Sequence, residues 1–275
     1  MKLIYNNLGV VNWVSKNKDL AIGFVPTMGA LHKGHLSLIS EAKKKADLVV
    51  VSIFVNPTQF GDKNDFANYP STLKQDLTAL ETLDVDMVFI PSSAEELYKN
   101  ESYDSIAFES IENIMEGSHR IGHFEGVARV VKLFLDLIKP KFAFFGEKDF
   151  QQLLIIKALI KKLEIKTEII ACKTVRESDG LAMSSRNTRL SKQHRSLAPN
   201  IYKVLGLCLQ KAKTMEFNDL ENACLKELSK FSSPEYFEIR NANDLSKSGG
   251  DNTKWRAFVA TKLGDIRLID NIELN

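Results

Sequence analysis

The chain of 275 residues lacks features that several large classes of protein require. It has only three cysteines, Cys172, Cys208 and Cys224, which are odd in number and far apart. This argues against a disulfide framework and a zinc site, and it fits a reducing cytoplasm. No apolar run is long enough to span a membrane. The apolar stretch after Met1 is too short for a signal peptide, so we expect a cytoplasmic protein.

The chain also has little excess charge. Its formal net charge is +2 and it has no long tract of lysine and arginine, so nothing in it favours a nucleic-acid partner. It is 44% hydrophobic and 26% charged, which is typical of a globular protein with one large domain or two smaller ones. There are no repeats and no low-complexity tract.

Several familiar motifs are absent as well. The sequence contains neither G-x-x-x-x-G-K-[ST] nor G-x-G-x-x-G, and it has no Ser/His/Asp set with a recognisable local context. Any nucleotide site must therefore be built in another way.

What the chain does contain is an alternation of apolar runs and amphipathic segments over its first two-thirds. An almost wholly apolar run such as residues 47–55 is typical of a central parallel strand covered on both faces. This alternation predicts a Rossmann-like, doubly wound parallel sheet. The expected strands are 20–25, 47–55, 86–90, 142–145 and 166–172, and the expected helices are 35–46, 70–83, 127–138 and 151–163.

The pattern changes near Thr174, where a turn-rich connector begins. We therefore predict two domains, a Rossmann-like one over 1–175 and a smaller α+β domain over 176–275. Ligands of doubly wound sheets bind beyond the carboxyl ends of the strands, and the most polar loops, 26–35, 56–69 and 146–152, all follow strands. In the second domain we expect helices over 191–212 and 218–231, and strands over 235–240, 254–262 and 266–272.

The most informative segment joins the first of these strands to a helix, and it reads Pro26-Thr27-Met28-Gly29-Ala30-Leu31-His32-Lys33-Gly34-His35. The first backbone N–H groups of a helix lack partners within it and favour an anion such as phosphate. His32 and His35 lie on the same side of the first turn, so both can donate to one phosphate group. The histidines could instead cap the helix or bind a metal, but no third ligand is obvious nearby.

Two further loops carry polar side chains that suit a small substrate. Asn56 and Gln59 follow the most buried strand, and their amides both donate and accept hydrogen bonds. The same amides could equally satisfy the backbone of their own loop. Lys148 follows Gly146 and supplies a positive charge for a phosphate, and Gln152 would point back toward the strand ends.

The segment Met183-Ser184-Ser185-Arg186-Asn187 follows the connector. Two hydroxyls and an arginine suit the oxygens of a triphosphate, although a solvated turn capped by a serine would have the same composition. Its place at the predicted domain junction, near Arg176, favours a mobile lid.

Taken together, these segments resemble the pantothenate synthetase (pantoate–β-alanine ligase) family, whose fold is a Rossmann-like sheet of the HxGH nucleotidyltransferase type. The likeness extends over nearly the whole chain, in the order of the family's motifs. This chain has Ile121, Ser71 and Asp62 where a proline, an arginine and a proline are common. The segments that carry the likeness are 26–35, 55–60, 144–152 and 174–187, with Gly122-His123-Phe124-Glu125-Gly126-Val127 and Arg267-Leu268-Ile269-Asp270-Asn271 in addition.

The resemblance implies an AMP-forming ligase that joins pantoate to β-alanine. The pantoate carboxylate would attack the α-phosphorus of ATP to give pantoyl adenylate and pyrophosphate, and the amine of β-alanine would then displace AMP to form pantothenate. It also implies that ATP is used with Mg2+ and that the protein is a cytoplasmic homodimer, with no nucleic-acid or membrane partner.

The resemblance further assigns roles to single residues. His35 is expected to be the proton donor, and His32 and Lys148 are expected to be catalytic as well. Gln59, Gln152 and Asn56 would hold pantoate, and Gln59 would also hold β-alanine. The residues expected to contact ATP are Met28, Gly29, Ala30, Leu31, His32, Lys33, Gly34, His35, Gly146, Glu147, Lys148, Asp149, Val175, Met183, Ser184, Ser185 and Arg186.

Two alternatives stay open at this stage. An adenylyltransferase with the same histidine turn would leave AMP on its product and would need no amine site. A non-catalytic nucleotide-binding module, or a synthetase-like protein that recognises tRNA, belongs to a different class, and the near-neutral charge weighs against tRNA.

Overall fold

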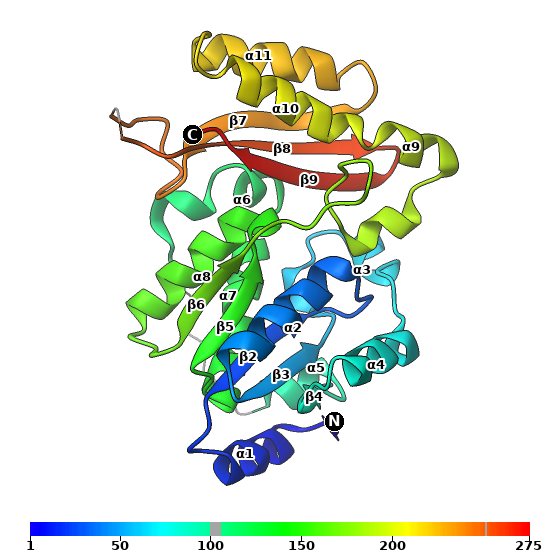
Figure 1. The fold of residues 1–275 in the computed structure, drawn as a ribbon, viewed down its shortest axis with the longest axis vertical. Helices are drawn as coiled ribbons and strands as arrows, with labels where there is room; N and C mark the ends of the chain where they lie inside the picture. Colours follow the sequence, from blue (N-terminus) through cyan, green and yellow to red (C-terminus); the bar gives the residue numbers. More distant parts are fainter. Residues whose placement is uncertain (100–105, 251) are drawn as a thin grey trace. The chain divides into compact units, whose positions relative to one another are not determined.

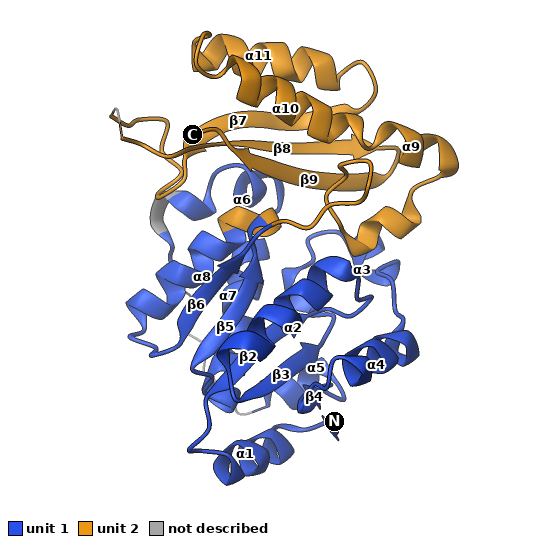
Figure 2. Ribbon diagram, in the orientation of Figure 1, with its two compact units in different colours: residues 1–147, 152–173 blue, residues 148–151, 174–275 orange. Residues whose placement is uncertain are grey.

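The computed structural model describes residues 1–99, 106–250 and 252–275. The chain divides into two compact units, which Figure 2 draws in different colours: unit 1 is Met1–Glu147 and Gln152–Lys173, and unit 2 is Lys148–Gln151 and Thr174–Asn275. This division differs from the predicted domains because it places Lys148–Gln151, Thr174 and Val175 with the C-terminal part of the chain.

Unit 1 is built on a six-stranded sheet with the strand order β1-β4-β3-β2-β5-β6 (Figure 1). Each neighbouring pair of strands is parallel. The predicted doubly wound, Rossmann-like parallel sheet is therefore confirmed. The strands are β1 (Lys2–Ile4), β2 (Ile22–Thr27), β3 (Leu48–Ile53), β4 (Met87–Phe89), β5 (Phe142–Gly146) and β6 (Glu168–Cys172).

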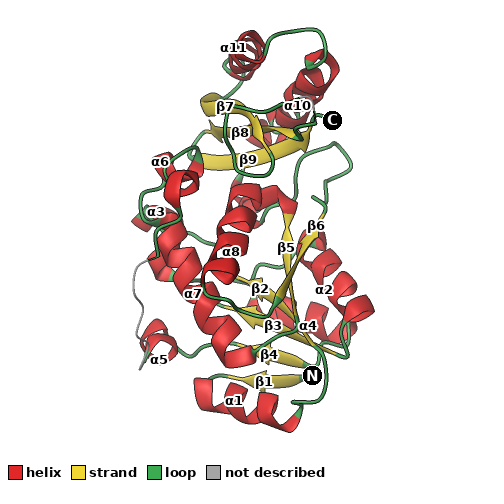
Figure 3. Ribbon diagram, turned by 90° about the vertical axis from the view of Figure 1, so that its left-hand side faces the viewer, coloured by secondary structure: helices red, strands yellow, loops and turns green. Residues whose placement is uncertain are grey.

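Helices α2 (Lys33–Lys45) and α7 (His123–Ile138) cover opposite faces of the central strand β2 (Figure 3). Successive side chains of a strand point to opposite faces. Phe24 packs edge-on against Phe134 of α7, with 5.7 Å between ring centroids. A Cβ on the preceding Gly23 would instead lie 2.9 Å from Cβ of Ala46, at the end of α2. The absence of a side chain at Gly23 thus lets α2 lie close against the sheet.

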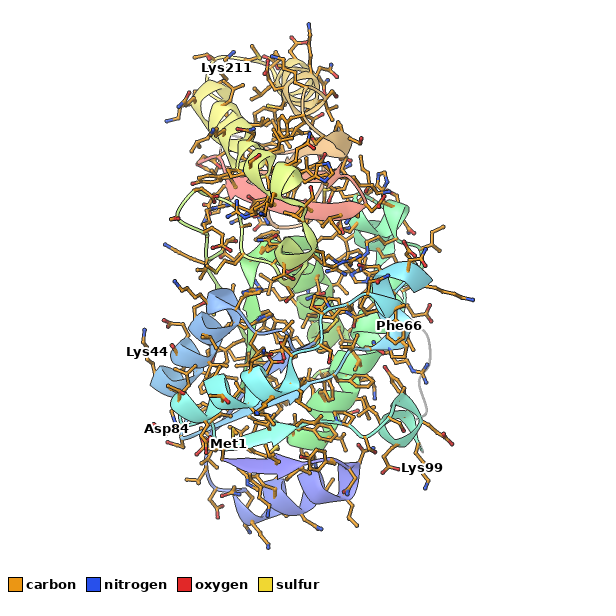
Figure 4. All side chains as sticks on the ribbon, turned by 90° about the vertical axis from the view of Figure 1, so that its right-hand side faces the viewer. Met1, Lys44, Phe66, Asp84, Lys99 and Lys211 are labelled. Atoms are coloured by element: carbon orange, nitrogen blue, oxygen red, sulfur yellow. The ribbon has the colours of Figure 1, made fainter. Side chains whose placement is uncertain are left out.

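The remaining helices of unit 1 lie around this framework. The lysines at the end of α2 are on its outer face, as Lys44 shows in Figure 4. No helix of the described segments is long and apolar enough to cross a membrane. The helices are α1 (Asn7–Lys16), α3 (Lys63–Ala67), α4 (Leu73–Thr82), α5 (Ala94–Tyr98) and α6 (Glu116–His119), with short 3-10 helices η1 (Pro57–Gln59) and η2 (Glu109–Glu112). The 3-10 helix η3 (Glu147–Asp149) and helix α8 (Phe150–Lys162) have residues in both units, because Lys148–Gln151 belong to unit 2.

One local prediction for unit 1 needs correction, and several of its elements were not predicted. The sequence pattern did not predict β1, which has 3 residues, or α1. The helix expected from Pro70 begins at Leu73, with Thr72 as its N-cap. The Thr72 hydroxyl donates to the carboxylate of Asp76 in the first turn, at 3.0 Å, which fixes this start.

Unit 2 has an antiparallel sheet of three strands in the order β7-β8-β9, and its helices α10 and α11 pack on that sheet through one apolar core. The predicted smaller α+β part of the fold is confirmed. The helix expected over 191–212 is in fact two helices, because Pro199 separates them and cannot continue a helical hydrogen-bond ladder. The elements are β7 (Ser233–Asn241), β8 (Trp255–Leu263), β9 (Ile266–Glu273), α9 (Lys192–Leu197), α10 (Asn200–Lys211), α11 (Phe217–Leu228) and η4 (Ser185–Arg189).

Candidate active site

The strand order of the sheet changes direction at β2. One side of β2 pairs with β3, and the other side pairs with β5. The chain continues outward from β3 to β4 on one side and from β5 to β6 on the other. Ligands of open parallel sheets bind at such a switch point, beyond the carboxyl ends of the strands. The loops that leave β2 and β3 in unit 1 are two of the polar loops singled out in the sequence.

The loop after β2 turns sharply into α2. Gly29 and Ala30 both have positive φ, 78° and 49°, and His32 is the N-cap of the helix. Nδ1 of His32 accepts the backbone N–H of Gly34 at 3.1 Å. Nδ1 of His35 accepts the backbone N–H of His32 at 3.3 Å. The two imidazole rings lie side by side, with 4.0 Å between their centroids and 31° between their planes.

These hydrogen bonds determine which nitrogen of each histidine is the donor. A neutral imidazole has one acceptor nitrogen and one N–H donor. Because Nδ1 of His32 and Nδ1 of His35 both accept backbone N–H groups, each neutral ring carries its hydrogen on Nε2. The predicted capping and the predicted phosphate binding are thus compatible, since capping uses Nδ1 and leaves donation to Nε2. Among the described residues, no group of three or more His, Cys, Asp or Glu side chains is arranged to hold a metal.

Asp76 in α4 holds the histidine turn in place. Its Oδ2 accepts the backbone N–H of Ala30 at 2.9 Å, and its Oδ1 accepts that of Leu31 at 2.9 Å. The carboxylate is buried, with Asp76 2% exposed. A Cβ on Gly29 would lie 3.1 Å from Oδ2, so a side chain there would crowd the carboxylate, and glycine also suits the positive φ.

Asp76 was not predicted from the sequence, although a signal was present. Asp76 lies three residues after Leu73 and four before Leu80, so it falls on the apolar side of the predicted helix. A carboxylate on such a face must find hydrogen-bond donors when it is buried. That argument predicts a partner but does not identify it.

The loop after β3 holds Gln59 in a fixed orientation. Its Oε1 accepts from Nδ2 of Asn56 at 3.2 Å, and its Nε2 donates to Sδ of Met28 at 3.2 Å. The structure therefore brings together Met28, Asn56 and Gln59 from the loops after two neighbouring strands. Asn56 is 1% exposed, and its Oδ1 accepts the backbone N–H of Thr58. Asn56 thus satisfies its own loop, which is the alternative that the sequence left open.

Helix α7 supports this loop through two residues. Nδ1 of His123 is 2.8 Å from the carbonyl oxygen of Gln59, and because a carbonyl only accepts, Nδ1 carries the hydrogen. A Cβ on Gly126 would lie 2.4 Å from the carbonyl oxygen of Thr58. The segment around His123 and Gly126, which the sequence assigned no chemical role, therefore places Gln59.

The remaining residues predicted to bind ATP or pantoate are divided between the units. Gly146, Glu147 and Gln152 belong to unit 1, and Lys148, Asp149, Val175 and residues 183–186 belong to unit 2. A hairpin brings Val175 and Met183 together, since the backbone N–H of Met183 donates to the carbonyl of Val175 at 3.0 Å. Ser184 is the N-cap of η4, and its Oγ accepts the backbone N–H of Arg186 at 3.3 Å. The serine cap that the sequence left open as an alternative is therefore present.

Arg176, at the base of this hairpin, is bound to β9. Its Nη1 and Nη2 donate to the two carboxylate oxygens of Asp270 at 2.6 and 3.0 Å. Its guanidinium also lies 3.8 Å from the ring centroid of Tyr202. Burial raises the pKa of the Asp270 carboxyl, and the hydrogen bonds and charge of Arg176 oppose that change. Arg176 is thus a structural residue of the hairpin, and a mobile lid near it stays a prediction.

The fold and this site define a Rossmann-like α/β protein with a histidine-capped helix N-terminus at the switch point of its parallel sheet. The family model described as pantoate-beta-alanine ligase matches residues 4–273. The chain is 43% identical over 264 residues to the pantothenate synthetase of Flavobacterium psychrophilum, with 92% of each chain covered. The chain belongs to the pantoate–β-alanine ligase family, so the resemblance found in the sequence is confirmed.

Solved structures agree with this assignment. The chain is similar to the crystal structure of pantothenate synthetase from Thermus thermophilus, with a TM-score of 0.92, 35% identity, and 100% of this chain and 99% of that chain covered. It is also similar to pantoate-beta-alanine ligase from Francisella tularensis complexed with beta-gamma ATP and beta-alanine. That TM-score is 0.84, with 39% identity, and 100% of this chain and 98% of that chain covered.

Proposed function

We propose that this chain condenses pantoate with β-alanine, using ATP, to give pantothenate, AMP and pyrophosphate through a pantoyl-adenylate intermediate. Family membership supports this function. The structural observation that carries it is the histidine pair, because His32 and His35 bear their N–H donors on Nε2 at a helix N-terminus. That helix begins at the switch point of the sheet.

The first step needs positioning and charge stabilisation more than covalent help from the protein. A pantoate carboxylate oxygen forms a bond to the α-phosphorus of ATP, while the bond from that phosphorus to the pyrophosphate oxygen breaks. Negative charge develops on the phosphate oxygens. We propose that His32 and His35 donate hydrogen bonds to these oxygens, with His35 as the proton donor, and that the positive end of α2 adds to their effect.

In the second step the β-alanine amine attacks the acyl carbon of pantoyl adenylate, and AMP leaves. We propose that Gln59 and Gln152 hold pantoate, with Asn56 as the residue that orients Gln59, and that Gln59 also lies near β-alanine. An amide both donates and accepts hydrogen bonds, so it suits the hydroxyls and the carboxylate of pantoate.

ATP is proposed to contact residues from both units. In unit 1 these are Met28 to His35, Gly146 and Glu147, and in unit 2 they are Lys148, Asp149, Val175 and Met183 to Arg186. Because an acyl adenylate hydrolyses readily, exclusion of water would protect it, which supports the proposal that residues 176–275 act as a lid.

Mg2+ is proposed to enter with ATP. This ion keeps several of its waters and is commonly held by the phosphates of a nucleotide and one or two carboxylates. Among the described residues no group of three or more His, Cys, Asp or Glu side chains is arranged to hold a metal, so the proposed mode relies on the ATP phosphates for most of the ligands. Bound Mg2+ would neutralise charge on the phosphates. A cytoplasmic homodimer is proposed from the family resemblance, and the three buried free cysteines fit a reducing compartment.

An exchange assay tests the function directly. Exchange of labelled pyrophosphate into ATP is expected only when pantoate is present, and release of AMP is expected to require β-alanine as well. An adenylyltransferase would instead accumulate its adenylated product when β-alanine is added. Exchange that an amino acid drives as well as pantoate does would overturn the ligase proposal.

A further inference from the structure

One side chain of β9 binds the segment Lys148–Gln151 to the sheet of unit 2. Nδ2 of Asn271 donates to the carbonyl oxygen of Lys148 at 2.9 Å, across 123 residues of sequence. Asn271 is buried, at 3% exposed. Lys148–Gln151 therefore belong to unit 2, although the residues that precede and follow them in the chain belong to unit 1.

Arg256 of the neighbouring strand β8 fixes the orientation of this amide. Its Nη1 donates to Oδ1 of Asn271 at 2.6 Å. A guanidinium only donates, so the oxygen of the Asn271 amide must face Arg256. The nitrogen of the amide then faces the carbonyl of Lys148, which only accepts. Both ends of the amide are thus matched, and the reverse orientation would oppose two donors at one end and two acceptors at the other.

Arg256 also packs on the segment itself. Its guanidinium lies 4.1 Å from the ring centroid of Phe150, and that ring lies 5.8 Å from the ring of Phe258 on β8. Arg256 is only 6% exposed. Cation–π contacts and hydrogen bonds are stronger when they are desolvated. The main chain of Lys148 and the side chain of Phe150 are therefore both held by β8 and β9.

The residue before Asn271 also binds a segment that is proposed to contact ATP. Asp270 binds Arg176 with both carboxylate oxygens, and Arg176 follows Val175 directly. Two successive residues of β9 therefore hold the two segments of unit 2 that are proposed to contact ATP.

We infer that Asn271 is a positioning residue for Lys148. It fixes the main chain from which the Lys148 ammonium reaches the phosphates, and it does not touch the substrate itself. A lysine is a point charge on a flexible stem, so the direction of its ammonium depends on where its backbone is held. This inference rests on the proposed function, because it takes Lys148 as a ligand of the ATP phosphates.

The variant Asn271→Asp gives a sharp test. It keeps the acceptor for Arg256 and the size of the side chain, but it replaces the donor that faces the carbonyl of Lys148 with an oxygen. We expect the affinity for ATP, measured by calorimetry with ATP alone, to fall about tenfold, which corresponds to roughly 1.4 kcal/mol. Thr261→Val is the matched control, because it removes the 2.7 Å hydrogen bond between Thr261 of β8 and Ser232 in the same unit. It should leave ATP affinity within about twofold.

A double-mutant cycle separates positioning from general stability. In a Lys148→Ala background, Asn271→Asp should have almost no further effect on ATP affinity, because the ammonium that it positions is gone. A merely structural role would give the same loss in both backgrounds, and that result would overturn the inference. If Asn271→Asp does not fold, the same cycle is run with Asn271→Ala.

The two proposals can fail separately. A wild-type protein that binds ATP but shows no pantoate-dependent exchange would refute the proposed function and leave the cycle meaningful. Additive losses in a protein that does carry out exchange would refute only the role of Asn271.

Discussion

The carboxylate of Asp76 and the backbone N–H of Leu31 meet at 2.9 Å, although 45 residues of sequence separate them. The other oxygen of the same carboxylate accepts from Ala30. In a turn with two residues of positive φ, the backbone N–H groups of Ala30 and Leu31 find their acceptor in another segment of the chain, because a buried N–H needs a partner. The place of the imidazoles at the start of α2 is therefore set partly by α4.

Replacing Asp76 should disturb the histidine turn. Asp76→Asn keeps the size of the side chain but loses one of the two acceptors, so a backbone N–H of the turn is left without its bond. We expect a loss of about 1–3 kcal/mol in the free energy of unfolding and at least a roughly tenfold loss of pantoate-dependent exchange per folded molecule. Urea denaturation and the exchange assay measure the two effects.

Asp86→Asn is the control for this variant. Asp86 also accepts a backbone N–H, that of Val49 at 2.7 Å, but it does so at the amino end of β3. It should cost stability and leave exchange per folded molecule nearly unchanged. Equal activity in the Asp76 and Asp86 variants would show that Asp76 has no special relation to the reaction.

The two functions of His32 can be separated by substitution. Asparagine is a favourable N-cap, so His32→Asn should keep the bond to the backbone N–H of Gly34 and change the free energy of unfolding by only about 0.5 kcal/mol. It removes the Nε2 donor, and adenylate formation should fall by about a hundredfold.

His35→Ala should abolish adenylate formation in a protein that stays folded by circular dichroism. Near-normal exchange in either variant would remove that histidine from the mechanism.

Gly126 should not tolerate a side chain. A Cβ there would lie 2.4 Å from a backbone carbonyl of η1, and a backbone cannot move aside as a flexible side chain can. Gly126→Ala should destabilise the protein by about 1–3 kcal/mol and raise the KM for pantoate, because it displaces Gln59. In contrast, a Cβ on Gly206 of α10 meets nothing within 4 Å. Gly206→Ala should stabilise the helix by up to about 1 kcal/mol, and a similar loss in both variants would refute this explanation.

Glu235 should give unit 2 a pH-dependent stability. Burial opposes its ionisation, but the hydrogen bonds and charges of Arg267 and Lys262 hold the pKa of Glu235 below its usual value of 4.5. The stability that these ion pairs contribute is therefore present above about pH 4.5, and it is lost as the pH falls through the lower pKa of the folded state. Glu235→Gln should cost about 1 kcal/mol at pH 7.

The measurement compares the unfolding free energies of wild type and Glu235→Gln between pH 7 and pH 3. The gap between them should narrow as the pH falls below 4.5. If the difference in unfolding free energy stays constant over this range, Arg267 and Lys262 do not stabilise the ionised Glu235 carboxylate in the folded state, and the prediction is wrong.

Local patterns in the sequence predicted much of the fold. The apolar run over 47–55 contains β3, and the glycines and histidines of residues 29–35 lie at the start of α2. In both segments the structure follows from local features, namely the spacing of apolar residues and the residues that favour turns. The family was also predictable, because its motifs occur in order along the chain. The roles of single site residues stay predictions.

What the sequence did not predict depends on partners far along the chain. Asp76 looked like one polar residue in a helix, and only the fold shows that it binds Ala30 and Leu31. Asn271 was part of a recognised motif, yet its bond to Lys148 needs the register of β8 and β9. Such long-range pairs satisfy buried polar groups, and a periodic pattern says that a partner must exist without saying which residue it is.

The bond between Asn271 and Lys148 limits how this protein can be recombined. A hybrid that joins residues 1–173 of this chain to the C-terminal part of a relative would take Lys148 from one parent and its anchoring strand from the other. A crossover near residue 173, where the sequence pattern changes, would therefore separate Lys148 from Asn271, the residue that positions its main chain. A hybrid should therefore bind ATP normally only if the second parent supplies an asparagine and an arginine at the positions of Asn271 and Arg256.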